Sequence, residues 1–251
     1  KINYYFKSTI NEKEILPQKK WFKKFEKYWN PTEDQASKEL KKFIRDRITN
    51  YSEHRNFPSQ IGTSKLSPYI KHGHIHVETI WDECRKIRNK GINKFLAEIG
   101  WREFNHSLIN YFPHMLKENY SKKFDKFPWR KNSKFLDAWK NGLTGYPIVD
   151  AGMRELRHTG WMHNRVRMIV GSFLVKHLLI NWKDGEMYFR NCLLDYSEAN
   201  NVSGWQWVAG CGADAAPYFR IFNPILQGEK FDKDGKYVRK WVPEIKDIPN
   251  K

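Results

Sequence analysis

The residues best suited to chemistry lie in residues 144–224, where tryptophan, asparagine, arginine and aspartate are interleaved. This stretch contains TGYPIVDAGMR at 144–154, TGWMHNRVRM at 159–168, GWQW at 204–207 and DAAPYFRIFNP at 214–224. An ordinary helical core uses leucine, isoleucine and alanine, because buried polar groups are costly without partners. The polar residues in this stretch therefore predict a cavity for a polar, aromatic ligand.

Composition indicates a folded chain with an anionic partner. Of the 251 residues, 40% are hydrophobic and 16% aromatic, with eleven tryptophans, which excludes a disordered chain and predicts an aromatic-rich core. The balance of 45 Lys and Arg against 28 Asp and Glu gives a net charge of +17, which favours nucleic acid as a partner. The alternative for the charge alone is an ordinary enzyme with a lysine-coated surface.

The cysteines and the apolar runs bear on the compartment. Cys84, Cys192 and Cys211 are far apart and form no C-x-x-C pair, so neither a disulfide framework nor a zinc site is indicated. The apolar run at 169–175 is too short to span a bilayer. We therefore expect a cytoplasmic, intracellular monomer that associates with DNA and not with a membrane. The chain begins with Lys, so a segment upstream is also expected.

Apolar spacing predicts an all-α fold. Residues 1–30 are expected to be a lead-in, either one amphipathic helix after Pro17 or a linker, and residues 31–251 the functional domain. The first domain helix is expected to start after Asn30 or Thr32 and to end near Tyr51. No segment alternates as a strand would. Further helices are expected at residues 77–87, 90–111, 134–141, 148–158, 162–180 and 183–194.

Three local patterns predict binding groups. Residues 62–67 (GTSKLS) supply hydroxyls and backbone N–H groups for a phosphate, although such clusters also simply cap helices. Residues 72–76 (HGHIH) would share a strand face, but no Cys or carboxylate cluster accompanies them, so no metal site is expected. Asp150 and Asp214 are interpreted as structural capping or pairing groups.

Helical spacing brings other side chains together. Glu98 and Trp101 share one face, which suits an acid and a ring in one cavity, although a surface Glu beside a core Trp is the commoner case. Asn164 and Met168 share another face. On that helix, Arg165 is expected to meet a DNA phosphate and Arg167 to pair with a buried carboxylate such as Asp195.

These motifs together resemble the flavin-binding helical domain of the DNA photolyase and cryptochrome family, most closely bacterial (class I) cyclobutane pyrimidine dimer photolyases. The resemblance covers residues 31–251. It implies a helical FAD-binding domain without the family's N-terminal α/β antenna domain, so no antenna chromophore is expected in this chain. Relatives that repair the (6-4) lesion carry a second His after the position of His163, whereas this chain has Asn164.

The resemblance implies one non-covalently bound FAD. Asn201 is expected to face the central ring nitrogen of the flavin, and residues 62–67 the pyrophosphate. Ser197 departs from the family pattern, which has an acid at that position, so one flavin contact is in question. The residues expected to bind FAD are Tyr51, Thr63, Ser64, Lys65, Leu66, Ser67, Arg167, Asp195, Ser197 and Asn201.

The resemblance also implies a lesion pocket and an electron path. A pyrimidine dimer flipped out of the duplex needs stacking and hydrogen-bonding partners. The residues expected to contact the lesion or DNA are Arg55, Glu98, Trp101, Asn164, Arg165, Met168, Trp207 and Arg220, with Glu98 and Asn164 also catalytic. The tryptophans expected to carry electrons between flavin and solvent are Trp205, Trp182 and Trp129.

The expected activity is light-driven repair of cyclobutane pyrimidine dimers in double-stranded or single-stranded DNA, by a carbon–carbon lyase that uses reduced FAD. The absence of a Ser-His-Asp or metal signature fits, because the cofactor supplies the difficult chemistry. One alternative is a cryptochrome-like photoreceptor that binds FAD without repairing DNA. A further alternative is a DNA-binding module that does not depend on light.

Overall fold

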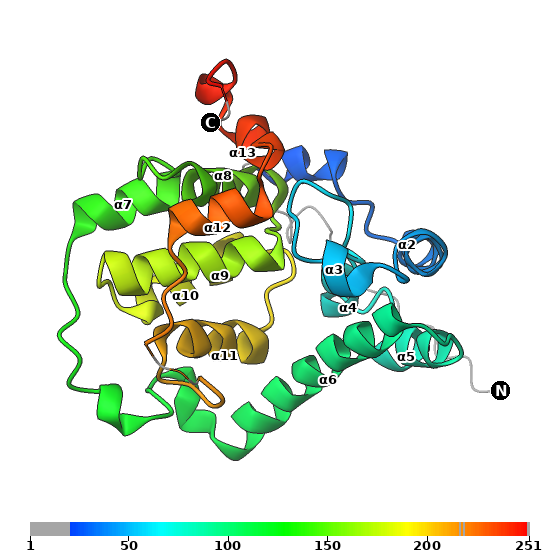
Figure 1. Cartoon of the computed structure of the whole chain (residues 1–251). Coiled ribbons are helices and arrows are strands. Elements are labelled where there is room, and N and C mark those ends of the chain that lie inside the picture. Colours follow the sequence, from blue (N-terminus) through cyan, green and yellow to red (C-terminus); the bar gives the residue numbers. More distant parts are fainter. Residues whose placement is uncertain (1–20, 216, 218, 250–251) are drawn as a thin grey trace, which may run out of the picture.

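The structure, a computed structural model, describes residues 21–215, 217 and 219–249, and over these residues it contains helices and no strands. The all-α prediction is therefore confirmed (Figure 1). The elements in chain order are η1 (Trp21–Lys27), α2 (Glu33–Asp46), α3 (Tyr51–His54), α4 (Ser67–Lys71), α5 (Val77–Arg85), α6 (Lys90–Tyr111), η2 (Pro113–Leu116), η3 (Lys122–Phe124), α7 (Ser133–Asn141), α8 (Pro147–Thr159), α9 (Asn164–Ser172), η4 (Phe173–His177), α10 (Trp182–Cys192), α11 (Glu198–Ala209), α12 (Pro224–Phe231), α13 (Lys236–Trp241) and η5 (Pro243–Ile245).

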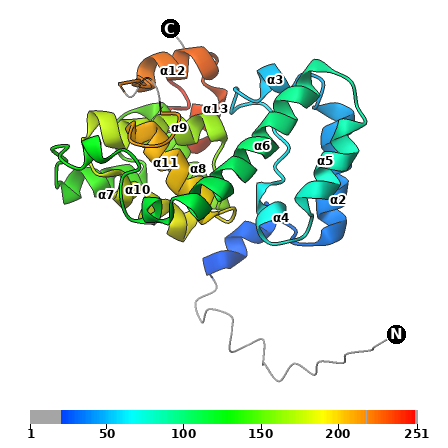
Figure 2. The same ribbon diagram turned by 90° about the horizontal axis from the view of Figure 1, so that it is seen from below.

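The helices form two groups, each with its own apolar core. The smaller core lies among α2 to α5 and the first half of α6, and the larger one among α7 to α11 and α13. Helix α6 crosses from one group to the other, which Figures 1 and 2 show from two directions. It contacts α3 and α5 in the smaller group and α11 in the larger one. Because α6 joins the two groups, a face of this helix borders the space between them.

Side-chain caps explain where several helices begin. Thr32 Oγ1 accepts a hydrogen bond from the backbone N–H of Gln35 (3.2 Å) at the start of α2. Asn89 Oδ1 accepts from Ile92 N (2.9 Å) at the start of α6, where the sequence predicted a helix over the same residues. Such caps satisfy N–H groups that have no partner within the helix.

The helices differ from the prediction in several places. The first domain helix ends at Asp46 instead of near Tyr51, because a turn places Ile48 in the smaller core before α3 begins. The segment predicted as one helix over residues 162–180 is α9 followed by the π-helical turn η4. Helices α3, α4, α11, α12 and α13 were not predicted. In α11 buried residues lie on several faces, so its sequence shows no single apolar stripe.

The described part of the lead-in contacts the body of the protein. Trp29 Nε1 donates to the carbonyl of Thr159 (2.8 Å), and its ring lies 6.1 Å from Tyr69 and 6.5 Å from Trp161. η1 also contacts α8. Residues 1–20 lie outside the described residues, and the predicted division at residue 30 stays a prediction.

Residues 72–76 lead into helix α5. His76 caps α5, where its Nδ1 accepts from Glu78 N (3.3 Å). Among the residues that the structure describes, no group of three or more His, Cys, Asp or Glu is placed to hold a metal. None of the described helices combines the length and hydropathy needed to cross a membrane.

Candidate functional site

A cavity of about 620 Å³ lies between α6 and the larger helical group. Its volume is in the range of ligand-binding pockets, which are roughly 300–1,000 Å³. Its walls come from α3, α6, α9, the segment before α11, and α11 itself. The predicted site residues that line it are Arg55, Glu98, Trp101, Asn164, Arg165, Arg167, Met168, Asp195, Ser197, Asn201, Trp205 and Trp207.

Glu98 lies on the α6 wall within an ion-pair cluster. Its Oε1 accepts a hydrogen bond from Arg55 Nη1 and lies 3.0 Å from Lys94 Nζ. Burial raises the pKa of Glu98, but Arg55 and Lys94 outweigh it, so the net pKa is below its ordinary value. Glu98 is therefore a carboxylate that presents acceptor oxygens at the cavity wall.

Trp101 extends the α6 wall towards solvent. It lies one turn after Glu98, is 47% exposed, and meets Phe104 edge to face at 5.5 Å. An exposed aromatic ring beside a cavity offers a flat apolar surface on which another ring can stack. Glu98 and Trp101 line the same cavity, and their roles there stay predictions.

Helix α9 brings Asn164 and Met168 to the opposite wall, with 4.0 Å between Asn164 Nδ2 and Met168 Sδ. The helix starts at a cap, since His163 Nδ1 accepts from Arg165 N (3.2 Å). Burial, with repulsion from nearby arginines, lowers the pKa of His163 to about 3. His163 is thus neutral at physiological pH and can act as this acceptor.

Arg165 is held beside the cavity. Its Nη2 donates to Asn56 Oδ1 (2.6 Å), and its guanidinium lies 4.4 Å from the centre of the Phe231 ring. Burial and the nearby charge of Arg55 lower the pKa of Arg165. Its predicted contact with a DNA phosphate stays a prediction.

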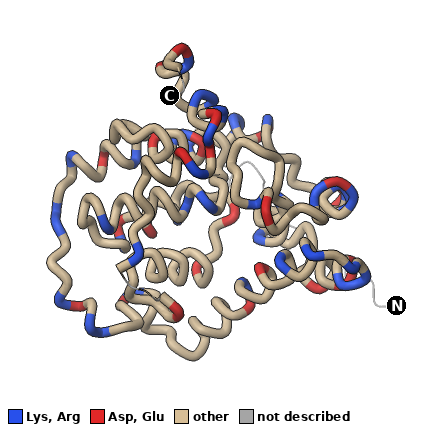
Figure 3. Tube along the Cα trace, viewed as in Figure 1, with Lys and Arg blue, Asp and Glu red and all other residues tan. Residues whose placement is uncertain are grey.

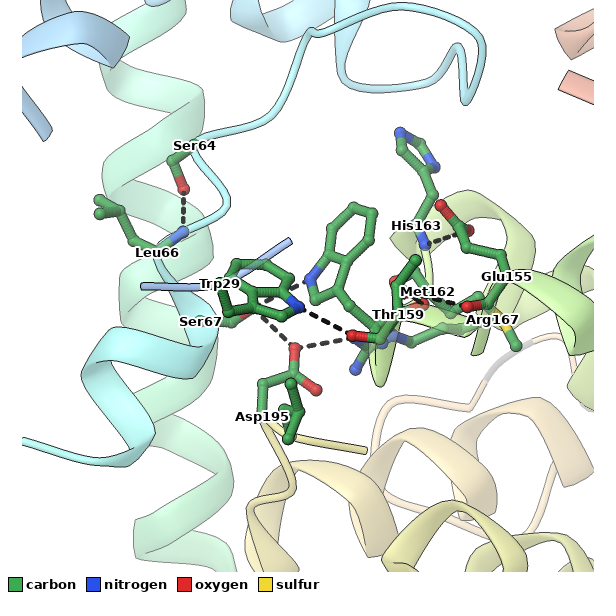
Figure 4. Close-up of polar contacts among 12 residues, drawn as sticks. Trp29, Ser64, Leu66, Ser67, Glu155, Thr159, Met162, His163, Arg167 and Asp195 are labelled. Atoms are coloured by element: carbon green, nitrogen blue, oxygen red, sulfur yellow. Dashed lines mark hydrogen bonds and ion pairs between the residues drawn. The ribbon is translucent and has the colours of Figure 1, made fainter. Parts of the chain in front are cut away.

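Asp195 pairs with Arg167, as the sequence predicted. Arg167 Nη2 donates to Asp195 Oδ2 (2.7 Å), and Ser67 Oγ donates to the same oxygen (2.6 Å). Arg167 Nε also donates to the carbonyl of Met162 (2.8 Å), which fixes the guanidinium (Figure 4). The other carboxylate oxygen, Asp195 Oδ1, is buried and has no hydrogen-bond partner among the described residues.

The predicted phosphate-binding segment, residues 62–67, lies behind Asp195 and outside the cavity lining. Ser64 Oγ accepts from Leu66 N (3.3 Å), and Lys65, at φ 56°, places its Nζ 5.3 Å from the centre of the Trp161 ring. Ser67 Oγ also accepts from Trp161 Nε1 (3.3 Å) (Figure 4). The backbone carbonyl of Thr63 accepts a hydrogen bond from Arg47 Nη1 (2.9 Å). The roles of these residues in binding FAD stay predictions.

Tyr51 packs within the smaller core, with its ring 5.5 Å from Phe43 and 5.3 Å from Phe95. Burial raises its pKa to about 12, against the opposing effect of Arg55. Tyr51 does not line the cavity, and its role in binding FAD also stays a prediction.

Ser197 and Asn201 each make a hydrogen bond with a neighbouring side chain. Asn201 Nδ2 donates to Glu186 Oε1 (3.2 Å), which orients its amide, and Ser197 Oγ accepts from Asn200 Nδ2 (2.9 Å). Sequence reasoning missed Asn105 and Asn200, which line the cavity and are joined by a 3.0 Å hydrogen bond. Asn105 was identifiable by spacing, because it lies two turns after Glu98 on the same face of α6.

The three tryptophans of the predicted electron path differ in burial. Trp205 is 4% exposed and lines the cavity, and Trp182 is 1% exposed and lies away from it. Trp129 is half-buried and packs against the larger core. Their role as an electron path stays a prediction.

Trp207 lines the cavity beside Phe222, with 6.1 Å between ring centres, and the exposed Arg220 lies 5.9 Å from the Trp207 ring.

Asp150 has the structural role predicted for it, since its carboxylate accepts from Thr144 N (2.8 Å) and Gly145 N (3.0 Å) before α8. Asp214 lies at φ 52° and lines the cavity, and its structural role stays a prediction.

The cavity residues fit a flavin nucleotide. Asp195 Oδ1 and Ser203 Oγ are buried polar atoms that lack a hydrogen-bond partner among the described residues, and both residues line the cavity. Buried polar atoms of native proteins are normally hydrogen-bonded. A ligand with both donors and acceptors would satisfy them, and the flavin ring system has both.

Comparisons with known proteins agree with this geometry. The family described as the FAD binding domain of DNA photolyase matches residues 95–251. A deoxyribodipyrimidine photo-lyase from Agrobacterium fabrum is 50% identical over 242 residues, which are 94% of this chain and 50% of that protein. The chain thus spans about half the length of the curated relatives it matches.

Two solved structures are similar. A bacterial class III photolyase from Agrobacterium tumefaciens gives a TM-score of 0.90 at 49% identity, over 95% of this chain and 51% of that one. A cryptochrome from Synechocystis gives 0.83 at 34% identity, over 89% and 48%. The class I assignment stays a prediction, and similarity to a class III enzyme does not favour it. The chain therefore belongs to the DNA photolyase family and carries its FAD-binding domain.

Proposed function

We propose that this chain repairs cyclobutane pyrimidine dimers in DNA with light and reduced FAD, as a deoxyribodipyrimidine photo-lyase. The observation that carries the proposal is the shared cavity. Glu98, Trp101, Asn164, Met168 and Trp207, the residues assigned to the lesion, line the same cavity as Arg167, Asp195 and Asn201, the residues assigned to the flavin. Direct electron transfer requires the lesion and the flavin ring to lie together in one cavity.

The α6 wall and Trp207 would hold the flipped lesion. Trp101 and Trp207 supply flat surfaces to replace the stacking that the bases lose when they leave the duplex. Glu98 offers carboxylate oxygens to base N–H groups, and the Asn164 amide offers both a donor and an acceptor. Met168 fills the remaining space with a flexible, polarizable side chain.

The wall formed by α9, α11 and the segment before α11 would hold the cofactor. Asp195 accepts hydrogen bonds, Arg167 holds Asp195 in place, and Asn201 presents an amide whose orientation Glu186 fixes. Bound reduced FAD supplies the light-driven electron that opens the cyclobutane ring. The protein's own residues orient the two partners, which is the usual division of labour in cofactor enzymes.

Positive charge would hold the DNA backbone. Arg55, Lys94, Arg102 and Arg165 line the cavity. Figure 3 shows Lys and Arg over both helical groups. With a net charge of +17, binding should weaken steeply as salt is raised.

The test is illumination of the FAD-loaded, photoreduced protein with an oligonucleotide that carries a single pyrimidine dimer. The proposal predicts loss of the dimer in light and none in the dark. Trp207→Leu should reduce lesion binding while the visible flavin absorbance is retained. A protein that keeps its flavin and shows no repair in light would instead support the alternative of a cryptochrome-like photoreceptor.

A further inference from the structure

Trp182 is hydrogen-bonded through a buried amide to a carboxylate. Its Nε1 donates to Asn119 Oδ1 (2.9 Å), and Asn119 Nδ2 donates to Asp125 Oδ1 (2.7 Å). Trp182 is 1% exposed and Asn119 8% exposed. An indole N–H is only a donor and a carboxylate only an acceptor, so the two partners fix which way the Asn119 amide points.

Gln206 fixes the backbone on both sides of Asn119. This fully buried residue lies between Trp205 and Trp207 in the sequence. Its Nε2 donates to the carbonyl of Glu118 (2.9 Å), and its Oε1 accepts from Tyr120 N (2.8 Å). The position of Asn119 beside Trp182 is therefore set from α11, the helix that carries the cavity-lining Trp205.

Trp205 has a different environment. Its Nε1 is buried and has no hydrogen-bond partner among the described residues. Its ring lies against α10, because a Cβ at Gly185 would come within 2.2 Å of Trp205 Cη2. Gly185 is one turn after Trp182 on that helix. The rings of Trp182 and Trp205 therefore differ in their hydrogen bonding. Among the described residues, the indole N–H of Trp182 has an acceptor and that of Trp205 has none.

We propose that Asn119 is a positioning residue for electron transfer, which makes Trp182 a better electron donor than Trp205. This rests on the proposed function and on the predicted tryptophan path, along which Trp205 would give one electron to bound FAD when that cofactor is in its oxidised form. One electron then passes from Trp182 to the oxidised Trp205, which returns to its neutral form and leaves Trp182 as a radical cation. No covalent bond forms or breaks, and the indole proton stays on Trp182 Nε1.

Two properties of the contact support this assignment. A hydrogen bond strengthens when its donor becomes charged, so the Asn119 oxygen stabilises oxidised Trp182 more than neutral Trp182. The Asp125 carboxylate adds a negative charge behind the amide, which acts in the same direction. An amide oxygen is too weak a base to remove the proton, so the positive charge remains mobile and can pass on or return.

The test compares Asn119→Leu, Asn119→Asp and Asp125→Asn in the FAD-loaded protein by flash absorption of oxidised tryptophan. Asn119→Leu should lower the yield of long-lived oxidised tryptophan by about tenfold. A factor of about ten corresponds to the free energy of one hydrogen bond from a charged donor. Asp125→Asn should lower it less. Asn119→Asp keeps an oxygen acceptor but is a stronger base than an amide, so it should keep the yield while shifting the signal from the tryptophan radical cation to the deprotonated tryptophan radical. Flavin content and thermal midpoint identify any variant that fails to fold.

A second readout does not depend on flavin. In the ¹⁵N-labelled protein, the indole N–H of Trp182 should exchange with solvent faster in Asn119→Leu than in the parent or in Asn119→Asp. Trp182→Phe distinguishes a failure of the tryptophan path from a failure of the role proposed for Asn119. If Trp182→Phe leaves the yield unchanged, the tryptophan path itself is wrong and this inference falls with it. If Trp182→Phe abolishes the yield but Asn119→Leu matches the parent, only the role of Asn119 is overturned.

Discussion

The two walls of the cavity are built differently. On the α6 wall, Trp101 is 47% exposed and the Glu98 side chain 28% exposed, with partners that also reach solvent. On the other wall, the Asp195 side chain is 2% exposed and pairs with Arg167, and Trp205 is 4% exposed. The α6 wall suits a large partner that arrives from solvent, whereas the opposite wall suits a small group held permanently.

The largest expected effect is on the buried wall. Arg167→Leu leaves the Asp195 carboxylate buried without its charged partner, which typically costs about 3–5 kcal/mol. We expect a loss of this size in the free energy of unfolding by urea, together with loss of bound FAD. Arg45→Leu is the control, because Arg45 pairs with Asp46 at 75% side-chain exposure. Equal effects of the two changes would contradict the contrast between buried and exposed pairs.

Two helix glycines give the next comparison. Gly185→Ala places a Cβ 2.2 Å from Trp205 Cη2, and such overpacking costs about 1–3 kcal/mol. At Gly100, on α6, a Cβ meets nothing within 4 Å, so Gly100→Ala should stabilise by about 0.4–1 kcal/mol. Thermal unfolding of both variants measures these changes in stability. A Gly185→Ala protein as stable as the parent would show that α10 does not press on Trp205.

The exposed wall should affect lesion binding more than stability. Glu98→Gln removes acceptor capacity and charge, so preference for dimer-containing over undamaged DNA should fall by about tenfold. Glu103→Gln on the same helix is the control, because Glu103 is exposed and pairs with the neighbouring Arg102. Fluorescence anisotropy at fixed salt measures both. If Glu98→Gln and Glu103→Gln show the same preference for dimer-containing over undamaged DNA, Glu98 does not contact the lesion.

The smallest effect concerns pH. Arg55 and Lys94 outweigh burial and hold the pKa of Glu98 below its ordinary value of about 4.3. The stability that Glu98 contributes is thus present above the unfolded pKa and lost as pH falls through the folded pKa. Because Glu98 is partly exposed, the difference between parent and Glu98→Gln should be below about 1 kcal/mol near pH 6 and should shrink as the pH falls below about 4.3. A difference that does not change with pH would contradict this.

Sequence predicted most of the helices and much of the cavity lining. Side chains at helical spacing, such as Glu98 with Trp101 and Asn164 with Met168, reached one cavity because spacing on a helix fixes direction. The pairing of Arg167 with Asp195 was predicted because a buried carboxylate needs a charged partner, and the family resemblance pointed to the same pair.

The rest depended on tertiary contacts that sequence does not display. Asn119 carries no motif, and its role appears only when Gln206 and Trp182 are brought to it. Helix α11 was missed because its residues are buried on several faces, which removes the periodic signal. Residues 62–67 showed a phosphate-binding composition, whereas the structure places them outside the cavity lining, joined to it through Ser67 and Asp195.

The central claim is that one cavity holds the flavin and the lesion together. The most direct measurement is a titration of the FAD-loaded protein with a dimer-containing oligonucleotide, followed through the visible absorption band of the flavin. We predict a shift in that band that saturates at one lesion per flavin and does not occur with undamaged DNA of the same sequence. Binding of the damaged oligonucleotide without any change in the flavin spectrum would contradict the account.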